Sequence, residues 1–253
     1  MVEAAVQLTD VRVTSRGLRA ARLNTGGEGA DSVILDGVSL EVAAGATLSV
    51  LGESGGGKST LFRTINRLID ADAGNVNVLG KGVREWDIRG LRRTAVYVAQ
   101  RSYLFGGTVR EELYLPQKWN GQPTLKLAVA DVMQAVQLKV ELERPSKELS
   151  EGQRHRLNIA RAMLLRPKLL LLDEPTGALD VRTAREMLGE IKRWVENEGI
   201  TLMCITHRPE DLEVLGGDAL ILLGGKVAGR YPAADVAAGK VDADVSAFLG
   251  SPS

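Results

Sequence analysis

Short apolar runs recur along the chain, and they alternate with stretches whose apolar residues repeat at helical spacing. Apolar runs bounded by turn residues are typical of strands buried on both faces, and their alternation with helices favours an α/β domain with a largely parallel sheet. We expect the central strands of this sheet at residues 46–51, 94–99, 169–173, 200–206 and 219–223.

The amino-terminal part shows a different pattern. Apolar and polar positions alternate in residues 6–13 and 38–42, which together with residues 75–79 predict a smaller antiparallel β layer. Residues 17–32 are rich in glycine, alanine and arginine, and we interpret them as a mobile loop.

A helical subdomain is expected to interrupt the sheet. Its clearest helix covers residues 124–138, whose apolar side chains recur at helical spacing and form one face. We therefore expect one domain over residues 1–253, with a core of residues 1–100 and 149–253 and a small helical subdomain of residues 101–148. The chain beyond Gly224 is short, polar and alanine-rich, too small for a further regulatory domain.

The composition limits the possible partners. Of the 253 residues, 44% are hydrophobic and 25% charged, which is enough for a substantial core. Basic and acidic residues number 32 each, so no net charge attracts nucleic acid, and we expect no nucleic-acid partner. The single Cys204 and a start unlike a signal peptide favour the cytosol. No apolar run approaches the roughly 20 residues of a membrane span, so any membrane role requires a partner.

The strongest chemical signal is a glycine-rich segment between an apolar strand and an amphipathic run. Glycines let the backbone curl so that its N–H groups point at a polyphosphate, and the following helix adds its positive end. Lys58 is predicted to reach the β- and γ-phosphates, and Ser59 to bind Mg²⁺. A plain strand-to-helix turn is the alternative, but the number of matching features favours nucleotide binding. The predicted phosphate loop comprises Gly52, Ser54, Gly55, Gly56, Gly57, Lys58, Ser59 and Thr60.

Two adjacent acids follow the apolar run of residues 169–172. Ligands bind at the carboxyl edge of such sheets, so Asp173 is suited to hold Mg²⁺ through its water shell and Glu174 to orient or deprotonate an attacking water. For an isolated pair, an acidic turn before the next helix would be the better explanation. The phosphate loop elsewhere in the chain makes that alternative weaker.

The sequence predicts a helix start at Leu149-Ser150-Glu151-Gly152-Gln153. The serine and the glutamine three residues later form a capping box, which is the structural explanation and holds in any case. The functional interpretation adds that Gly152 permits close backbone approach, so that this helix start can donate to a γ-phosphate.

These residues converge on a family. Six motifs occur in the order found in ATP-binding-cassette (ABC) ATPases. They are the phosphate loop, Gln100, the pentapeptide at 149–153, the Asp173-Glu174 strand end, the Gly177 to Asp180 segment and His207. The chain resembles this family over residues 34–230, and the pentapeptide is similar to its LSGGQ signature. The resemblance implies a P-loop NTPase fold and an ATPase that uses ATP and Mg²⁺.

The resemblance also implies roles for individual residues. Two chains, as a homodimer or a heterodimer, would sandwich two ATP molecules, with Ser150, Gly152 and Gln153 contacting the nucleotide of the other chain. Gln100 would join Ser59 and Asp173 around Mg²⁺ and the water, and His207 would contact the γ-phosphate and hold Glu174. Asp180 would line the dimer seam. Taken alone, Gln100 and His207 are better explained as a strand-end amide and a turn histidine. His155 has no motif position, and we expect it to be a solvated helix residue.

Residues 102–113 follow Gln100, where ABC ATPases receive a cytoplasmic helix of their permease. We expect the permease to dock near Tyr103 to Val109, which would place the chain in the cytoplasm at the inner face of a membrane. Packing of the small subdomain explains Tyr103, Leu104 and Phe105 equally well. At a finer level this region resembles ATPase subunits of Fet-type iron exporters and plant aluminium-tolerance half-complexes, and this resemblance implies metal-ion export.

Several residues depart from the family pattern. The sequence has no aromatic residue before Phe62 to stack on adenine, and the guanidinium of Arg16 is the candidate replacement, which predicts weak purine selectivity. Glu151 stands where the signature commonly has glycine, and its charge is expected to weaken the dimer. Gly177 replaces a frequent serine, and Glu53 a frequent proline.

We therefore expect the ATP-hydrolysing subunit of an ABC transporter that drives a separate membrane permease. The alternative is a soluble ABC ATPase of the iron–sulfur assembly type. Only 48 residues separate Gln100 from Leu149, which leaves no room for the long coiled coil of DNA-acting types. A nucleotide-dependent scaffold without useful hydrolysis is disfavoured by Glu174 and His207.

Overall fold

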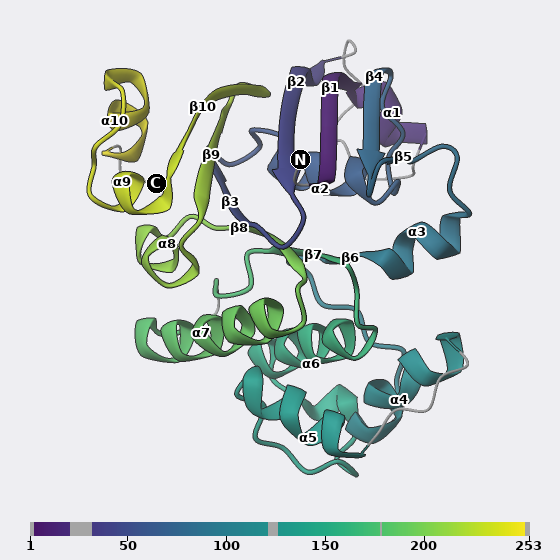
Figure 1. The fold of residues 1–253 in the computed structure, drawn as a ribbon. Helices are drawn as coiled ribbons and strands as arrows, with labels where there is room; N and C mark the ends of the chain where they lie inside the picture. The colour runs from purple at the N-terminus through teal and green to yellow at the C-terminus, as the bar shows by residue number, and fades with distance from the viewer. Residues whose placement is uncertain (1–2, 21–31, 121–125, 178, 251–253) are drawn as a thin grey trace.

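Two β-sheets and a helical region organise the chain in the computed structural model, which describes residues 3–20, 32–120, 126–177 and 179–250 (Figure 1). The larger sheet has six strands in the order β10-β9-β3-β8-β7-β6. Neighbouring strands from β9 to β6 run parallel, and β10 pairs antiparallel at the edge. These strands are β3 (Thr47–Gly52), β6 (Ala95–Val98), β7 (Leu169–Asp173), β8 (Thr201–Ile205), β9 (Asp218–Leu223) and β10 (Lys226–Pro232).

The predicted parallel strands are therefore confirmed. Every residue of β7 and of β8 is buried, as expected for strands covered on both faces. The α/β fold class with a mostly parallel sheet is correct, and β10 adds an edge strand that the sequence pattern did not indicate.

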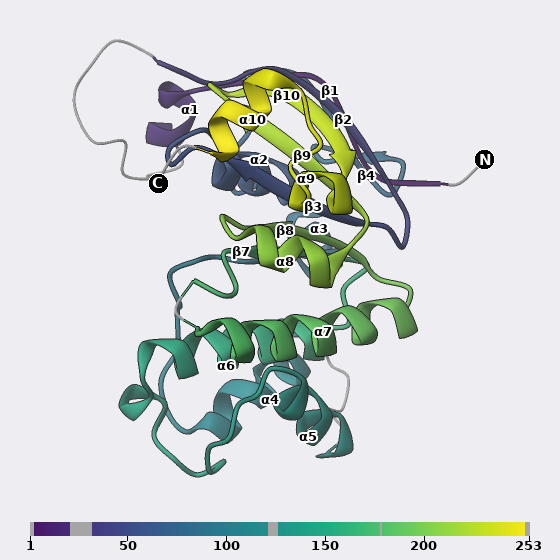
Figure 2. The same ribbon diagram turned by 90° about the vertical axis from the view of Figure 1, so that its left-hand side faces the viewer.

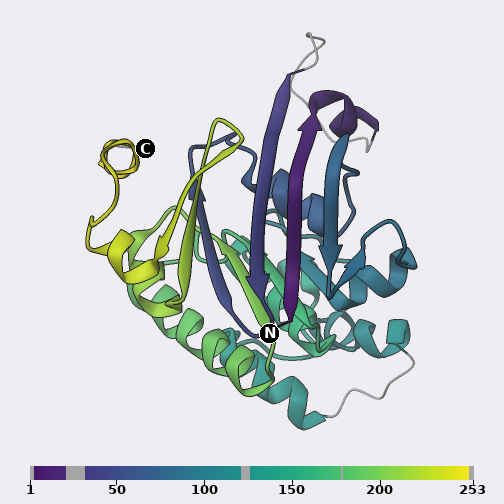
Figure 3. The same ribbon diagram turned by 45° about the horizontal axis from the view of Figure 1, so that its top comes forward.

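The smaller sheet is antiparallel, with the order β2-β1-β4-β5 (Figure 3). Val6 pairs with Val42 and Leu8 with Leu40, so the alternating apolar residues share one face. That face packs on α2 and β3 in one hydrophobic cluster. The expected antiparallel layer is confirmed, and its first two strands are longer than predicted. Its strands are β1 (Ala4–Thr14), β2 (Val33–Ala43), β4 (Ala73–Val78) and β5 (Lys81–Gly82).

Helices lie on both sides of the larger sheet. Figure 2 shows α6 and α7 between this sheet and the pair α4 and α5, while α2 lies on the opposite side. The helices are α1 (Ser15–Ala20), α2 (Lys58–Ile65), α3 (Ile88–Thr94), α4 (Val109–Asn120), α5 (Lys126–Ala135), the 3-10 helix η1 (Ser146–Glu148), α6 (Glu151–Leu164), α7 (Val181–Asn197), α8 (Pro209–Leu215), α9 (Ala233–Ala237) and α10 (Ala243–Leu249).

Two local expectations need correction. The prediction of a loop at residues 17–32 is wrong at its start, because α1 continues to Ala20. Leu18 of this helix is buried in the hydrophobic core that the smaller sheet covers. Residues 21–31 lie outside the described residues. The helix expected at 124–138 ends at Ala135, since Gln137 adopts the left-handed backbone conformation, and its first two residues are not described.

The segment after Gly224 packs against the edge of the larger sheet. Ala233 and Val236 of α9 and Val245 of α10 join Leu212 and Ile221 in a small hydrophobic cluster. Burial of these few side chains is enough to order a short alanine-rich segment on an existing core.

A buried ion pair joins α4 to α6. The Glu112 side chain is completely buried and pairs with the guanidinium of Arg161, which also donates to the carbonyl of Tyr103 at 2.9 Å. The second oxygen of Glu112 accepts from the backbone N–H of Gly106 at 2.8 Å. The pair therefore fixes residues 103–106 onto α6.

Removing one partner of this pair is expected to destabilise the chain strongly. Arg161→Met leaves the buried Glu112 carboxylate without its counter-charge, which costs about 3 to 5 kcal/mol of unfolding free energy. Urea unfolding measures this, with Arg182→Met as the matched control, because Arg182 pairs with Glu186 on the exposed face of α7 and contributes only about 0 to 1 kcal/mol. Equal losses in the two variants would contradict this account of the buried pair.

Candidate nucleotide site

The loop between β3 and α2 is closely surrounded by other backbone segments. A Cβ atom on Gly52 would lie 2.1 Å from the carbonyl oxygen of Leu222. At Gly57 the backbone has φ 92°, and a Cβ atom would lie 2.8 Å from the carbonyl oxygen of Ile34. These two positions therefore require glycine, and the loop can present its N–H groups without intervening side chains.

Lys58 is the first residue of α2, and its side chain folds back over the loop. Its ammonium donates to the carbonyl oxygens of Gly52 at 2.8 Å and Glu53 at 2.7 Å. Burial lowers the pKa of Lys58, while the negative charges of Glu174, Asp173 and Glu53 act in the opposite direction. Since a buried cation gains from an anionic partner, the loop fits a phosphate group.

A cleft of about 220 Å³ lies over this loop. It brings together residues from separate parts of the chain, as the sequence predicts. Its lining consists of Ser54, Gly55, Gly56, Gly57, Lys58, Ser59, Thr60, Gln100, Glu174 and His207.

Glu174 is held between two side chains in this cleft. Gln100 Nε2 donates to Glu174 Oε2 at 2.6 Å, and His207 Nε2 lies 2.9 Å from Glu174 Oε1. The three residues follow β6, β7 and β8, which are neighbours in the sheet, so the strand order brings them together. The backbone N–H of Glu174 also donates to the carbonyl of Ile205 at 3.0 Å.

Asp173 is the last residue of β7 and is 2% exposed. Its Oδ2 accepts a hydrogen bond of 2.6 Å from the hydroxyl of Tyr97 on β6. Burial and the charge of Asp173 raise the pKa of Tyr97, so the phenol remains a donor at neutral pH. Sequence reasoning missed Tyr97, because only the pairing of β6 with β7 places it beside Asp173.

The predicted Mg²⁺ ligands offer only oxygen donors, namely the hydroxyl of Ser59, the amide of Gln100 and the carboxylate of Asp173. This chemistry suits Mg²⁺, which commonly binds one or two protein ligands together with substrate phosphates and water. In the described part of the chain, no three His, Cys, Asp or Glu side chains are grouped so that they could hold a metal by themselves. The residues therefore fit a magnesium ion that arrives with a polyphosphate.

The signature residues lie apart from this cleft. Ser150 Oγ accepts from the N–H of Gln153 at 3.2 Å and the Gln153 side chain accepts from the N–H of Ser150 at 3.0 Å, which confirms the predicted capping box of α6. A Cβ on Gly152 would meet no atom within 4 Å. None of the three lines the cleft of its own chain.

Two further predicted residues are also outside the cleft. Asp180 accepts from the N–H of Thr183 at 3.0 Å and caps α7, and this hydrogen bond lowers the pKa of its carboxyl. Ala178, two residues before it, lies outside the described residues. Arg16 is exposed on α1 and does not line the cleft.

The prediction of a solvated His155 is wrong. His155 is buried, its Nδ1 lies 3.4 Å from Ser102 Oγ, and burial lowers the pKa of the imidazole. The segment after Gln100 covers this position of α6. No sequence signal shows this, because the contact depends on the path of that segment.

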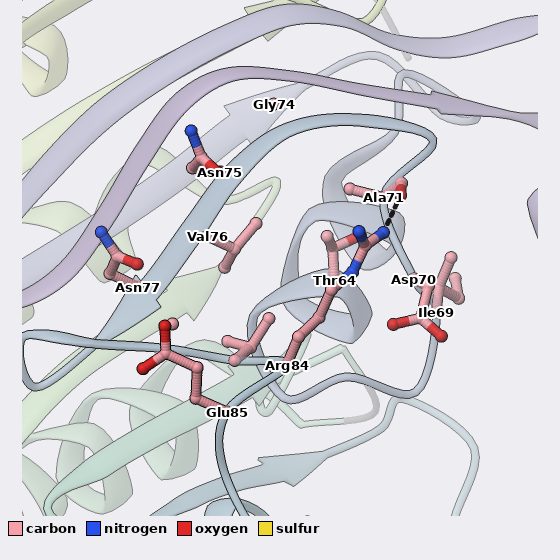
Figure 4. Close-up of a pocket in the computed structure, with 12 residues that line it drawn as sticks. Thr64, Ile69, Asp70, Ala71, Gly74, Asn75, Val76, Asn77, Arg84 and Glu85 are labelled. Atoms are coloured by element: carbon pink, nitrogen blue, oxygen red, sulfur yellow. Dashed lines mark hydrogen bonds between the residues drawn. The ribbon is translucent and has the colours of Figure 1, made fainter.

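A separate cleft of about 230 Å³ lies between the end of α2 and strands β4 and β5 (Figure 4). Arg84 crosses it and donates to the carbonyl of Ala71 at 2.8 Å. The predicted site residues do not line this cleft, so the chemistry indicated by the sequence belongs to the cleft over the phosphate loop. Among the described residues, no helix combines the length and apolar character required to cross a bilayer.

Comparison with known proteins gives consistent matches. Residues 35–177 match the family described as ABC transporter. A Bacillus subtilis (strain 168) protein named as an ABC transporter ATP-binding protein, YjkB, is 34% identical over 83% of this chain and 83% of its own length. The methionine import ATP-binding protein MetN 2 of Salmonella choleraesuis (strain SC-B67) is 35% identical over 80% of this chain, which spans 62% of that protein.

A solved structure is similar over nearly its whole length. It is the dimeric structure of a post-hydrolysis state of the ATP-binding cassette MJ0796 bound to ADP and phosphate, with a TM-score of 0.77 and 25% identity over 90% of this chain and 98% of that chain.

Tyr97→Phe tests the hydrogen bond to the predicted magnesium ligand. The substitution leaves the buried Asp173 without its phenolic donor, and we expect the Mg²⁺ concentration for half-maximal ATP hydrolysis to rise about 10-fold. Tyr231→Phe is the matched control, because Tyr231 donates to the exposed Asp242 at 2.7 Å, away from the cleft. The same Mg²⁺ dependence in wild type and Tyr97→Phe would show that this bond has no such role.

Proposed function

Because the chain belongs to the ABC transporter family and is an ATP-binding ATPase of that family, we propose that it hydrolyses ATP with Mg²⁺ to drive a separate membrane permease. The observation that carries the mechanism is the Glu174 carboxylate, held between Gln100 and His207 at the mouth of the phosphate loop. Such a carboxylate can orient and deprotonate a water for in-line attack on the γ-phosphate.

The surrounding residues would hold the triphosphate. Residues 55–60 line the cleft, and backbone N–H groups of this loop would donate to the triphosphate. Lys58 would exchange its carbonyl partners for the β- and γ-phosphates. Ser59, Gln100 and Asp173 would hold Mg²⁺, which neutralises charge that develops on the phosphates. His207 would donate to the γ-phosphate while its contact with Glu174 keeps the carboxylate directed at the water.

We further propose that two chains complete each site. Ser150, Gly152 and Gln153 line no part of their own cleft, and the open space around Gly152 suits the close approach of a phosphate from another molecule. The capped start of α6 would supply its positive end to that anion. Asp180 would then lie at the seam between the chains. A homodimer has two complete sites by symmetry, and a heterodimer with a related chain is the other arrangement.

The proposed permease contact is the segment from Tyr103 to Val109. Tyr103 and Phe105 are 68% and 57% exposed, and their rings pack edge to face at 5.2 Å. They border a groove of about 340 Å³ that extends to β6 and α6. Exposed aromatic residues beside a groove are typical of a docking surface for a helix. This contact would hold the chain on the cytoplasmic face of a membrane.

The helical subdomain, residues 101–148, would carry this contact as a unit on the core formed by residues 1–100 and 149–253. The exposed guanidinium of Arg16 remains our proposed platform for the base.

The transported substrate is a separate question. The expected metal-ion export and the Fet-type resemblance gain no support from the relatives described above, one of which is named for methionine import. The same relatives favour a transporter subunit over an iron–sulfur assembly ATPase. In such a system the permease lines the transport path, so the substrate depends on that partner.

Glu174→Gln tests the proposed mechanism. The amide keeps the shape of the side chain but cannot take a proton, so kcat is expected to fall by about 10² to 10⁴ while the dissociation constant for ATP stays within about twofold. Steady-state ATPase assays and a fluorescent nucleotide titration measure the two quantities. Glu198→Gln is the control, because Glu198 is exposed at the end of α7. Near-normal turnover in Glu174→Gln would exclude the assigned role.

A further inference from the structure

A buried carboxylate behind the cleft joins the loops that follow β7 and β8. Asp211, in the first turn of α8, is 2% exposed, and its Oδ2 accepts hydrogen bonds from two hydroxyls. Thr206 Oγ1 donates at 2.6 Å and Thr176 Oγ1 at 2.7 Å. Thr206 immediately precedes His207, and Thr176 lies two residues after Glu174.

Arg208 extends this connection toward α7. Its Nε lies 4.0 Å from Asp211 Oδ1, and its guanidinium donates to the carbonyls of Leu179 at 3.0 Å and Thr176 at 3.4 Å. Its own backbone N–H donates to Thr206 Oγ1 at 3.0 Å. Leu179 directly precedes Asp180, so the network ends next to the residue proposed to lie at the dimer seam.

The position of this network in the sheet gives it a specific consequence. The pairing of β7 with β8 ends at Asp173 opposite Ile205, and the Glu174 N–H makes one further bond to the Ile205 carbonyl. Beyond that point the two chain segments are held together by side chains. A buried carboxylate retains its charge only where hydrogen bonds and a cation compensate it, so its partners are held in narrow geometry.

We infer that Asp211 is a positioning residue, which sets the separation of Glu174 and His207 and connects it to the segment before Asp180. This inference rests on the proposed function, since it concerns the alignment of the proposed base. The hydroxyls of Thr176 and Thr206 both donate to the Asp211 carboxylate, and the Arg208 guanidinium lies beside it, so a displacement of one loop relative to the other strains a hydrogen bond to a charged group. Closure of the two chains at Asp180 would thereby shift the position of His207.

Asp211→Asn and Thr176→Val test this inference. Each keeps the approximate side-chain shape but removes a charge or a hydroxyl, and we expect kcat to fall about 10- to 100-fold while KM for ATP changes less than about threefold. Thr176→Ser, which retains the hydroxyl, is expected to restore kcat to within about twofold of wild type. If Asp211→Asn does not fold, the comparison of kcat between Thr176→Val and Thr176→Ser tests the inference by itself.

Thr201→Val is the matched control for these variants. Thr201 is equally buried, lies at the other end of β8 and accepts one hydrogen bond of 2.9 Å from the N–H of Gly45. We expect it to lower stability as much as Thr176→Val while leaving kcat unchanged. Equal losses of kcat in the two valine variants would show a general effect of destabilisation and overturn the inference.

A second readout separates positioning from a structural role. In a His207→Ala background one of the two groups whose separation Asp211 sets is absent, so adding Asp211→Asn is expected to lower kcat by less than about twofold further. Full additivity of the two losses would overturn the inference. Failure of the proposed function is recognised separately, because Glu174→Gln would then retain normal turnover or the wild-type chain would lack magnesium-dependent ATPase activity.

Discussion

The contact of Glu174 with Gln100 and His207 is the interaction on which the rest of the site depends. The three residues are far apart in the sequence, and they meet only because β6, β7 and β8 are adjacent and parallel and end at the same edge. A change in strand order or register would separate them. The buried apolar residues of β7 and β8 therefore serve the chemistry as well as the core, since they fix where the carboxylate emerges.

Several charged groups in this region are buried and are compensated locally. Lys58 contacts loop carbonyls, Asp173 accepts from Tyr97, and Asp211 accepts from two threonines. Such groups cost free energy unless they are hydrogen-bonded, so each restricts the geometry of its neighbours. The cleft is consequently preorganised on the side formed by this chain, while the signature residues at the start of α6 do not line it. In the proposed function a second chain supplies them.

Much of the fold and of the candidate site could be predicted from the sequence, because glycine spacing and apolar runs depend on local backbone requirements. The phosphate loop and the Glu174 strand end are of this kind. Burial of His155 could not be predicted, because it depends on the stretch after Gln100. The hydrogen bonds of Tyr97 to Asp173 and of Asp211 to two threonines could not be predicted either, because they depend on the neighbouring strand β7 and on the loops after β7 and β8. The short helix α1 was missed because a single buried leucine anchors a polar segment.

The central claim is that each site combines the phosphate loop of one chain with the signature of another. Mixing two defective variants tests it directly. Lys58→Met disables the phosphate loop, and Gly152→Asp places an acid where the anion should dock while the surrounding space tolerates the side chain. Each variant alone should be inactive, and an equimolar mixture should regain about one quarter of wild-type ATPase activity, because half of the symmetric dimers become mixed with one intact site each. A mixture no more active than its components would contradict the account.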